Sequence, residues 1–169
     1  MALMVPANNP LQHRTIKPLY AKTQATNQSM TLDPTFTAAS GDILPGCVMS
    51  YLGNGVVTLC DGTKAPYGLA DSFCAPGMNI DEVRENGLNL MGVWVGGEDS
   101  QFAIYPPAYD TGAGWTAQIA NLKAGKKVYL KSNAKGLLTL EDTPDTKTAN
   151  TICELLGMEG STLIVTFAR

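Results

Sequence analysis

The sequence predicts a mainly β protein, built as a small β-barrel or sandwich-like module with short helical turns and an extended N-terminal arm. Apolar stretches of strand length recur along most of the chain and are separated by turn-forming residues. Glycine and proline are abundant, with 17 and 10 residues in a chain of 169, and charged residues make up only 16%. This composition argues against a helical bundle. A hydrophobic content of 44% with a net charge of -3 argues against a disordered chain.

Residues 1–40 are predicted to form the extended arm, and residues 41–169 a β-rich domain. The arm contains four prolines and a polar stretch over residues 23–31, and no helical or strand-like apolar period runs through it. Its basic side chains outnumber its one acidic side chain, whereas the rest of the chain is acidic overall. Strand and turn signals begin only near Gly41, so we expect the domain to fold without residues 1–36.

The arm has two interpretations. It is either a solvated tail, as is common at chain ends, or a segment that becomes ordered on a neighbouring subunit. Its apolar side chains exceed what a solvated tail needs, which favours the second interpretation. In that case the apolar members would bury surface against the partner and the three cations would pair with acidic groups. The predicted contact residues are Leu11, Arg14, Ile16, Lys17, Leu19, Tyr20, Lys22 and Phe36.

The first predicted element of the domain is a β-hairpin around Gly53-Asn54-Gly55, because Asn-Gly between two apolar runs is the strongest short-range hairpin signal. A second hairpin is expected around residues 96–100 and a third around residues 132–136, each flanked by apolar runs. The predicted strands of these three hairpins are residues 47–52 with 56–60, 88–95 with 101–105, and 128–131 with 137–140.

Three further elements complete the expected domain. Residues 65–70 form a short extended piece. Residues 79–86 form one or two helical turns, with Asn79 as a capping residue and Gly87 as the end signal. Residues 162–167 are rich in β-branched side chains and are predicted to be the terminal strand.

The cysteines predict neither a metal site nor disulfides. Cys47, Cys60, Cys74 and Cys153 include no C-x-x-C pair, and one histidine cannot complete a zinc site. Four reduced, buried thiols are expected. The turn decides which residues face each other: a Gly53-Asn54 loop would pair Cys47 with Cys60, whereas an Asn54-Gly55 loop would set Met49 opposite Cys60.

Catalytic and cofactor motifs are missing, so we expect no enzyme activity and no cofactor. The lone histidine, His13, lies in the arm. Ser132 and Lys135 have the S-x-x-K spacing of serine acylases, but they lie between two predicted strands and precede Gly136, which indicates a turn. The acidic cluster of Glu141, Asp142 and Asp145 does not follow a calcium-loop spacing and is interpreted as a solvated loop.

Four aromatic residues near a Pro-Pro pair have two possible roles. They could stack against sugars on a β-module, or they could fill the core of a domain with only 7% aromatic residues, and we favour the core. These residues are Trp94, Tyr105, Tyr109 and Trp115.

Charge and hydropathy exclude two classes of partner. A pI near 5.0 argues against nucleic-acid binding. No stretch approaches the roughly 18 apolar residues of a membrane span, and the N-terminus lacks the basic region of a secretory signal. We therefore expect a soluble protein made in a cytoplasm.

A series of glycine-anchored motifs in the domain resembles a known family. The series opens with Ser40-Gly-Asp-Ile-Leu-Pro-Gly-Cys-Val, continues with Ala65-Pro-Tyr-Gly-Leu-Ala, and reaches Ala124-Gly-Lys-Lys-Val-Tyr-Leu and Gly136-Leu-Leu-Thr-Leu. Over residues 40–169 it is similar to the small decoration, or cement, proteins that stabilise the heads of tailed bacteriophages. Val128-Tyr129 stands where the family pattern has Leu-Tyr.

The resemblance implies a structural virion protein without enzyme activity. It would be made in the host cytoplasm, bind the outer surface of the assembled capsid and stabilise it by bridging capsid subunits. The implied partner is the major capsid protein, and the protein would be a homo-oligomer, with a trimer favoured and a dimer possible. The alternatives are a tail- or fibre-associated virion protein, a carbohydrate-binding β-module and an unrecognised hydrolase.

Overall fold

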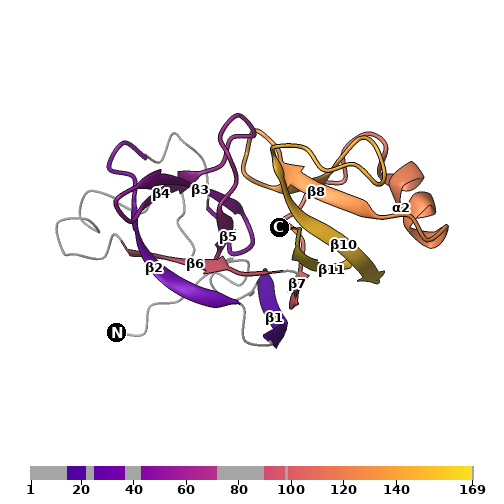
Figure 1. Ribbon diagram of the computed structural model, residues 1–169, viewed down its shortest axis with the longest axis horizontal. Coiled ribbons are helices and arrows are strands. Elements are labelled where there is room, and N and C mark those ends of the chain that lie inside the picture. The colour runs from indigo at the N-terminus through magenta and orange to yellow at the C-terminus, as the bar shows by residue number, and fades with distance from the viewer. Residues whose placement is uncertain (1–14, 22–24, 37–42, 72–89, 98, 169) are drawn as a thin grey trace, which may run out of the picture.

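The computed structural model describes residues 15–21, 25–36, 43–71, 90–97 and 99–168. These residues form eleven strands and one short helix, which confirms the predicted mainly β class. The strands are divided between a closed barrel and an open sheet, which lie side by side (Figure 1).

The barrel is closed by five strands in the order β2-β4-β3-β5-β6. All neighbours are antiparallel except β2 and β4, which run parallel. Alternate side chains point inward and form a core rich in methionine and valine, which includes Met30, Met49, Val57 and Val93. The barrel strands are β2 (Thr26–Leu32), β3 (Val48–Gly53), β4 (Val56–Leu59), β5 (Gly68–Ala70) and β6 (Leu90–Val95).

The sheet has six strands in the order β1-β7-β11-β10-β8-β9, and all its neighbours are antiparallel. Helix α2 (Trp115–Lys123) lies at the outer end of this sheet, beside β8 and β10 (Figure 1). The sheet strands are β1 (Ile16–Ala21), β7 (Ser100–Ile104), β8 (Val128–Ser132), β9 (Leu138–Leu140), β10 (Thr151–Glu159) and β11 (Thr162–Phe167).

Side chains and hydrogen bonds join the two units. Trp94, on the outside of β6, packs against Phe102 of β7 with ring centroids 5.6 Å apart. The Val48 N–H donates to the Gly136 carbonyl at 2.8 Å, and the Ser132 hydroxyl donates to the carbonyl of Cys60 at 2.8 Å. Because these bonds join barrel backbone to the hairpin β8–β9, the barrel and the sheet support each other.

Two strands lie inside the segment predicted to be an arm. β1 pairs with β7 at the edge of the sheet, and β2 pairs with both β4 and β6 in the barrel. The prediction that strands begin near Gly41 is therefore wrong. β1 contains Pro18 and a register shift, and it lies at the edge of the sheet. Because the strand is irregular, its sequence does not show the two-residue alternation of apolar side chains that indicates a strand. That the domain folds without residues 1–36 stays a prediction, and the pairing of β1 and β2 argues against it.

The first predicted hairpin is confirmed as β3–β4. Asn54 and Gly55 both have positive φ, 51° and 76°, as a two-residue type I′ turn requires. A register shift between Tyr51 and Gly53 then moves the pairing by one residue, so Met49 faces Leu59. Neither predicted pairing of Cys60 occurs.

The described cysteines are unbridged. Cys47, Cys60 and Cys153 are buried and form no disulfide, and Cys74 lies outside the described residues. Cys47 belongs to the barrel core, whereas Cys60 and Cys153 belong to the sheet core. That all four cysteines are unbridged stays a prediction, because Cys74 is not described.

The second predicted hairpin is wrong, although both of its strands exist. β6 pairs with β2 and β5 in the barrel, whereas β7 pairs with β1 and β11 in the sheet. Both hydrogen-bonding edges of each strand are thus taken by other strands. The chain passes from one unit to the other between residues 95 and 100 instead of turning back.

Two other predicted elements are confirmed, and two observed elements were not predicted. The third hairpin is confirmed as β8–β9, and the terminal strand as β11. Strand β10 was not predicted, because Gly157 interrupts its apolar pattern. Helix α2 was not predicted, because its segment is only weakly amphipathic and is flanked by glycines. The expected helical turns at residues 79–86 lie outside the described residues.

Candidate functional site

The structure separates the predicted contact residues into buried and exposed ones. Ile16 is fully buried in the sheet core, and Phe36 is 3% exposed in the barrel core. Both were expected to contact a partner, and this expectation is corrected: they pack inside their own chain. Their apolar character serves folding, because Ile16 begins the edge strand β1 of the sheet and Phe36 follows β2 of the barrel.

The exposed members of that set are fewer. Lys17 is exposed, and Leu19, at the irregular part of β1, is 44% exposed. Tyr20 belongs to β1 and is opposite Gln101 in the register. Leu11, Arg14 and Lys22 lie outside the described residues.

The large exposed hydrophobic side chains fall into two groups. Tyr51, Leu52 and Leu90 belong to the barrel and are 45%, 49% and 59% exposed. Leu19 and Leu156 belong to strands of the sheet. Each unit of the protein therefore presents apolar side chains to its surroundings.

The barrel group is continuous across four strands. Thr31 of β2 is opposite Leu90 on one side and Val56 on the other, and Val56 is opposite Gly53, which follows Leu52. Leu90 and Val56 point outward, because Met91 and Val57 beside them point into the barrel core. We call Tyr51, Leu52, Val56 and Leu90 the barrel-end patch.

Local contacts hold the patch rigid. The Gly55 N–H donates to the Tyr51 hydroxyl at 3.0 Å, which ties the turn to the aromatic ring. The Tyr51 ring stacks on Tyr67, with centroids 5.0 Å apart, and the Tyr67 hydroxyl donates to Gln28 at 3.0 Å. A preformed apolar surface loses little conformational entropy when a partner covers it.

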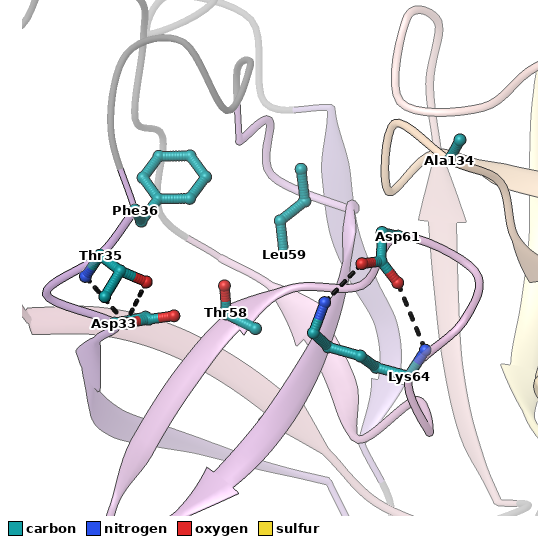
Figure 2. A pocket seen from close by; sticks show the side chains of 8 residues that line it. All are labelled: Asp33, Thr35, Phe36, Thr58, Leu59, Asp61, Lys64 and Ala134. Carbon is teal, nitrogen blue, oxygen red and sulfur yellow. Dashed lines mark hydrogen bonds and ion pairs between the residues drawn. The ribbon is translucent and has the colours of Figure 1, made fainter.

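A polar cleft of about 350 Å³ lies beside β4 (Figure 2). Phe36 and Leu59 provide its apolar part, and the turn that holds Ala134 borders it on the side of the sheet. Two carboxylates, Asp33 and Asp61, and the ammonium of Lys64 provide its polar part.

The carboxylates of this cleft organise turns. Asp33 accepts hydrogen bonds from the backbone N–H and the hydroxyl of Thr35, each at 2.9 Å. Asp61 accepts hydrogen bonds from the ammonium of Lys64 and from Thr63. The Lys64 contact, followed by the Thr63 bonds, holds the pKa of Asp61 well below its ordinary value. A carboxylate kept ionised in this way is a poor proton donor or acceptor near neutral pH, so Asp61 serves to hold its turn.

A match to a family model decides what kind of protein carries these surfaces. The model for phage cement proteins matches residues 2–168. The chain belongs to the phage cement protein family. No curated protein and no solved structure matches it. Membership of this family supports a capsid-associated structural role.

The S-x-x-K spacing in this cement protein belongs to a turn, as predicted. The hydroxyl of Ser132 is buried and bonded to the carbonyl of Cys60, while Lys135 follows on the exposed turn. The side-chain oxygen of Asn133 accepts hydrogen bonds from the N–H groups of Lys135 and Leu137 at 2.8 and 3.0 Å. Serine and lysine do not share a helix face here.

One member of the acidic cluster is buried, which corrects the prediction of a solvated loop. Glu141 is 4% exposed and accepts hydrogen bonds from the hydroxyls of Thr148 and Thr151 at 2.6 and 2.9 Å. Lys131 lies 3.2 Å from Glu141 and 3.0 Å from Asp142. Burial lowers the pKa of Lys131, but the hydrogen bonds that its ammonium donates to Asp142 and Glu141 outweigh burial and raise that pKa above its ordinary value. Buried charges need such partners, so this network anchors the loop after β9.

Three of the four aromatic residues, Trp94, Tyr109 and Trp115, are partly buried and pack against the sheet core. Trp94 lies between the barrel and the sheet, and its indole N–H donates to Asp71 at 2.9 Å. Tyr109 and Trp115 stack on each other with centroids 5.6 Å apart and pack against the sheet core. They form two separate contacts and no common platform.

Two features are absent from the described residues. No group of three or more histidine, cysteine, aspartate or glutamate side chains among them could hold a metal ion. The described helix is neither long nor apolar enough to cross a membrane.

Proposed function

We propose that this cement protein binds the outer surface of the assembled phage capsid and stabilises it by bridging neighbouring subunits of the major capsid protein. The barrel-end patch, on a member of a capsid-associated family, is the observation that carries the proposal. Exposed apolar surface of this kind favours a protein partner. Host-cytoplasm synthesis and an acidic, soluble body fit a protein that joins the shell after assembly.

The barrel-end patch supplies a useful part of the binding free energy. Complete burial of a large apolar side chain contributes about 1.5–3 kcal/mol, and Leu52 and Leu90 of the patch are 49% and 59% exposed. Covering Leu52 and Leu90 would therefore contribute about 1 kcal/mol each. Loss of both would raise the dissociation constant by about 30-fold.

Stabilisation of the shell follows from selective binding. A protein that binds the assembled capsid but not separated subunits stabilises the assembly by about 2.7 kcal/mol per site at a hundredfold excess over the dissociation constant. Bridging adds to this, because a subunit that leaves the shell must also break its contacts with the cement protein.

The N-terminal segment outside the described residues has a secondary part in this proposal. Leu11 could bury apolar surface against the shell, and Arg14 and Lys22 could pair with acidic capsid groups. Exposed ion pairs contribute at most about 1 kcal/mol each, so replacing the cations should matter less than replacing the barrel-end leucines.

Co-sedimentation with undecorated heads tests the proposal. Leu52→Ser/Leu90→Ser should fold normally but bind heads about 30-fold more weakly than the unchanged protein. Ala117→Ser on α2, an exposed apolar position remote from the patch, is the matched control and should bind fully. Full binding by the double variant would remove the barrel end from the interface. Binding to isolated tails, or to no particle, would overturn the capsid assignment.

A further inference from the structure

The turn between β3 and β4 contains a residue pair that is chemically labile. Asn54 is followed by Gly55, and asparagine is among the thermolabile residues of proteins. Glycine has no side chain to shield its backbone nitrogen, so that nitrogen can approach the asparagine side chain closely. Asn54 is exposed, and a Cβ added to Gly55 would meet no other atom within 4 Å. Water and base therefore reach both reacting groups.

The reaction open to this pair is deamidation, which needs only base and water. Base removes the proton of the Gly55 N–H, and the nitrogen forms a bond to the side-chain carbonyl carbon of Asn54. The bond from that carbon to Nδ2 breaks, and Nδ2 takes a proton from water and leaves as ammonia. Water then opens the cyclic imide at either of its carbonyls, which gives aspartate or isoaspartate. Asparagine and water are thus converted to one of these acids and ammonia, without oxidation or reduction.

The structure contains a restraint on this reaction. The Gly55 N–H donates to the Tyr51 hydroxyl at 3.0 Å, so the proton that base must remove is held in a hydrogen bond. The Tyr51 ring is itself fixed, because it stacks on Tyr67 with centroids 5.0 Å apart. This hydrogen bond must break before the Gly55 nitrogen can attack Asn54.

We propose that Asn54 is a site of spontaneous deamidation in this protein and that the Tyr51 hydroxyl sets the rate of the reaction. One ordinary hydrogen bond changes an equilibrium about fivefold, so loss of the acceptor should accelerate the reaction by about that factor. The reaction is a property of the isolated chain and does not depend on a partner.

Deamidation at this position alters the barrel-end patch. Gly53 is opposite Val56, so residue 54 lies in the turn between Leu52 and Val56 of the patch. Aspartate adds a charge that a partner would cover without a counterion, and this costs affinity. Isoaspartate brings its Cβ into the main chain, which lengthens a two-residue turn and shifts the strand ends that carry these side chains. This consequence rests on the function proposed above, whereas the reaction does not.

Mass spectrometry of digests tests the reaction on the full chain, incubated at mildly alkaline pH for several weeks. Conversion of the Asn54 amide to an acid should accumulate, together with isoaspartate detected by enzymatic methylation. Tyr51→Phe keeps the stacked ring but removes the acceptor, so it should deamidate Asn54 about fivefold faster than the unchanged protein. Tyr67→Phe is the matched control, because it removes the other hydroxyl of the stack, which bonds to Gln28, and it should not change the rate.

Two references accompany these variants. A synthetic peptide of residues 48–59, which lacks the fold, should deamidate faster than the folded chain. The second Asn-Gly pair of the sequence, Asn86-Gly87, is read in the same digests, and its rate should not respond to Tyr51→Phe. An unmodified Asn54 in both the unchanged protein and Tyr51→Phe would overturn the site. Equal rates in these two proteins would overturn the role of Tyr51.

Binding of Asn54→Asp to undecorated heads tests the consequence for the patch. This variant carries the charge of the product and should bind at least about tenfold more weakly than the unchanged protein. Thr116→Asp, which adds the same charge at an exposed position of α2, is the matched control and should bind fully. Full binding by Asn54→Asp would overturn the effect on the patch. If the unchanged protein does not bind heads, the proposed function fails, and the deamidation rates still decide this inference.

Discussion

Replacing Ile16 with alanine tests whether β1 belongs to the folded core. Ile16 is fully buried in the sheet core and is opposite Ile104 of β7. Truncating such a side chain costs about 2–5 kcal/mol, because transfer free energy is lost and a cavity is left. We expect about 3 kcal/mol, since β1 is an edge strand that can relax partly into the space. In a chain of this size that corresponds to a fall in Tm of roughly 6–12 °C.

The assay is thermal unfolding of dilute protein, followed by circular dichroism. Lys17→Ala, at the exposed neighbouring position, is the control and should change stability by no more than about 0.5 kcal/mol. Deletion of residues 1–21 removes the whole strand and uncovers Phe102 and Ile104, so the cooperative transition should broaden or disappear. If Ile16→Ala melts within about 2 °C of the unchanged protein, β1 is not part of the core and the arm is separable after all.

Three further predictions concern turns, acid stability and thiols. Gly136→Ala places a Cβ 2.3 Å from the Leu59 side chain, whereas Gly160→Ala, at a residue that also has positive φ, places it in open space. In urea unfolding, Gly136→Ala should therefore lower the free energy of unfolding by about 1–3 kcal/mol more than Gly160→Ala does. Equal losses for the two variants would contradict the packing at Gly136. The pKa of Asp61 is lowered in the folded protein, first by Lys64, so the ionised carboxylate stabilises the fold above pH 3.8. This stabilisation is lost as the pH falls through the pKa of the folded state. The destabilisation caused by Asp61→Asn should therefore shrink below pH 3.8 in acid titrations of unfolding, and a constant difference would refute this. Thiol titration of the denatured, unreduced protein should find four free thiols, and a count of two would reveal a disulfide.

Turns were predictable from the sequence because their chemistry is local. Asn54-Gly55 needs positive φ at both positions, and few other residue pairs adopt it at low cost. Asn133 closes its own turn through bonds to residues two and four positions later. The hairpins β3–β4 and β8–β9 follow directly, as does the mainly β class. The family resemblance rests on the same kind of short, glycine-anchored motifs, and the family match confirms it.

The pairing of strands that are far apart in sequence could not be predicted from the sequence. β6 and β7 look like a hairpin because they flank a glycine-rich turn, yet each has better partners elsewhere. β1 and β2 look like an arm because irregular strands at edges and barrel seams carry weak periodicity. Ile16 and Phe36 were assigned to a partner surface for the same reason: an apolar side chain in an unpaired segment looks available for binding.

Contact surfaces depend on the tertiary structure still more strongly. Leu52 and Leu90 are far apart in sequence, and only the pairing of β2 with both β4 and β6 places them on one patch. The sequence by itself determined the turns at Asn54 and Asn133, the mainly β class and the family, because these depend on neighbouring residues. Strand order, burial and the faces that meet a partner were decided by the tertiary structure, because they depend on which distant strands form hydrogen bonds with each other.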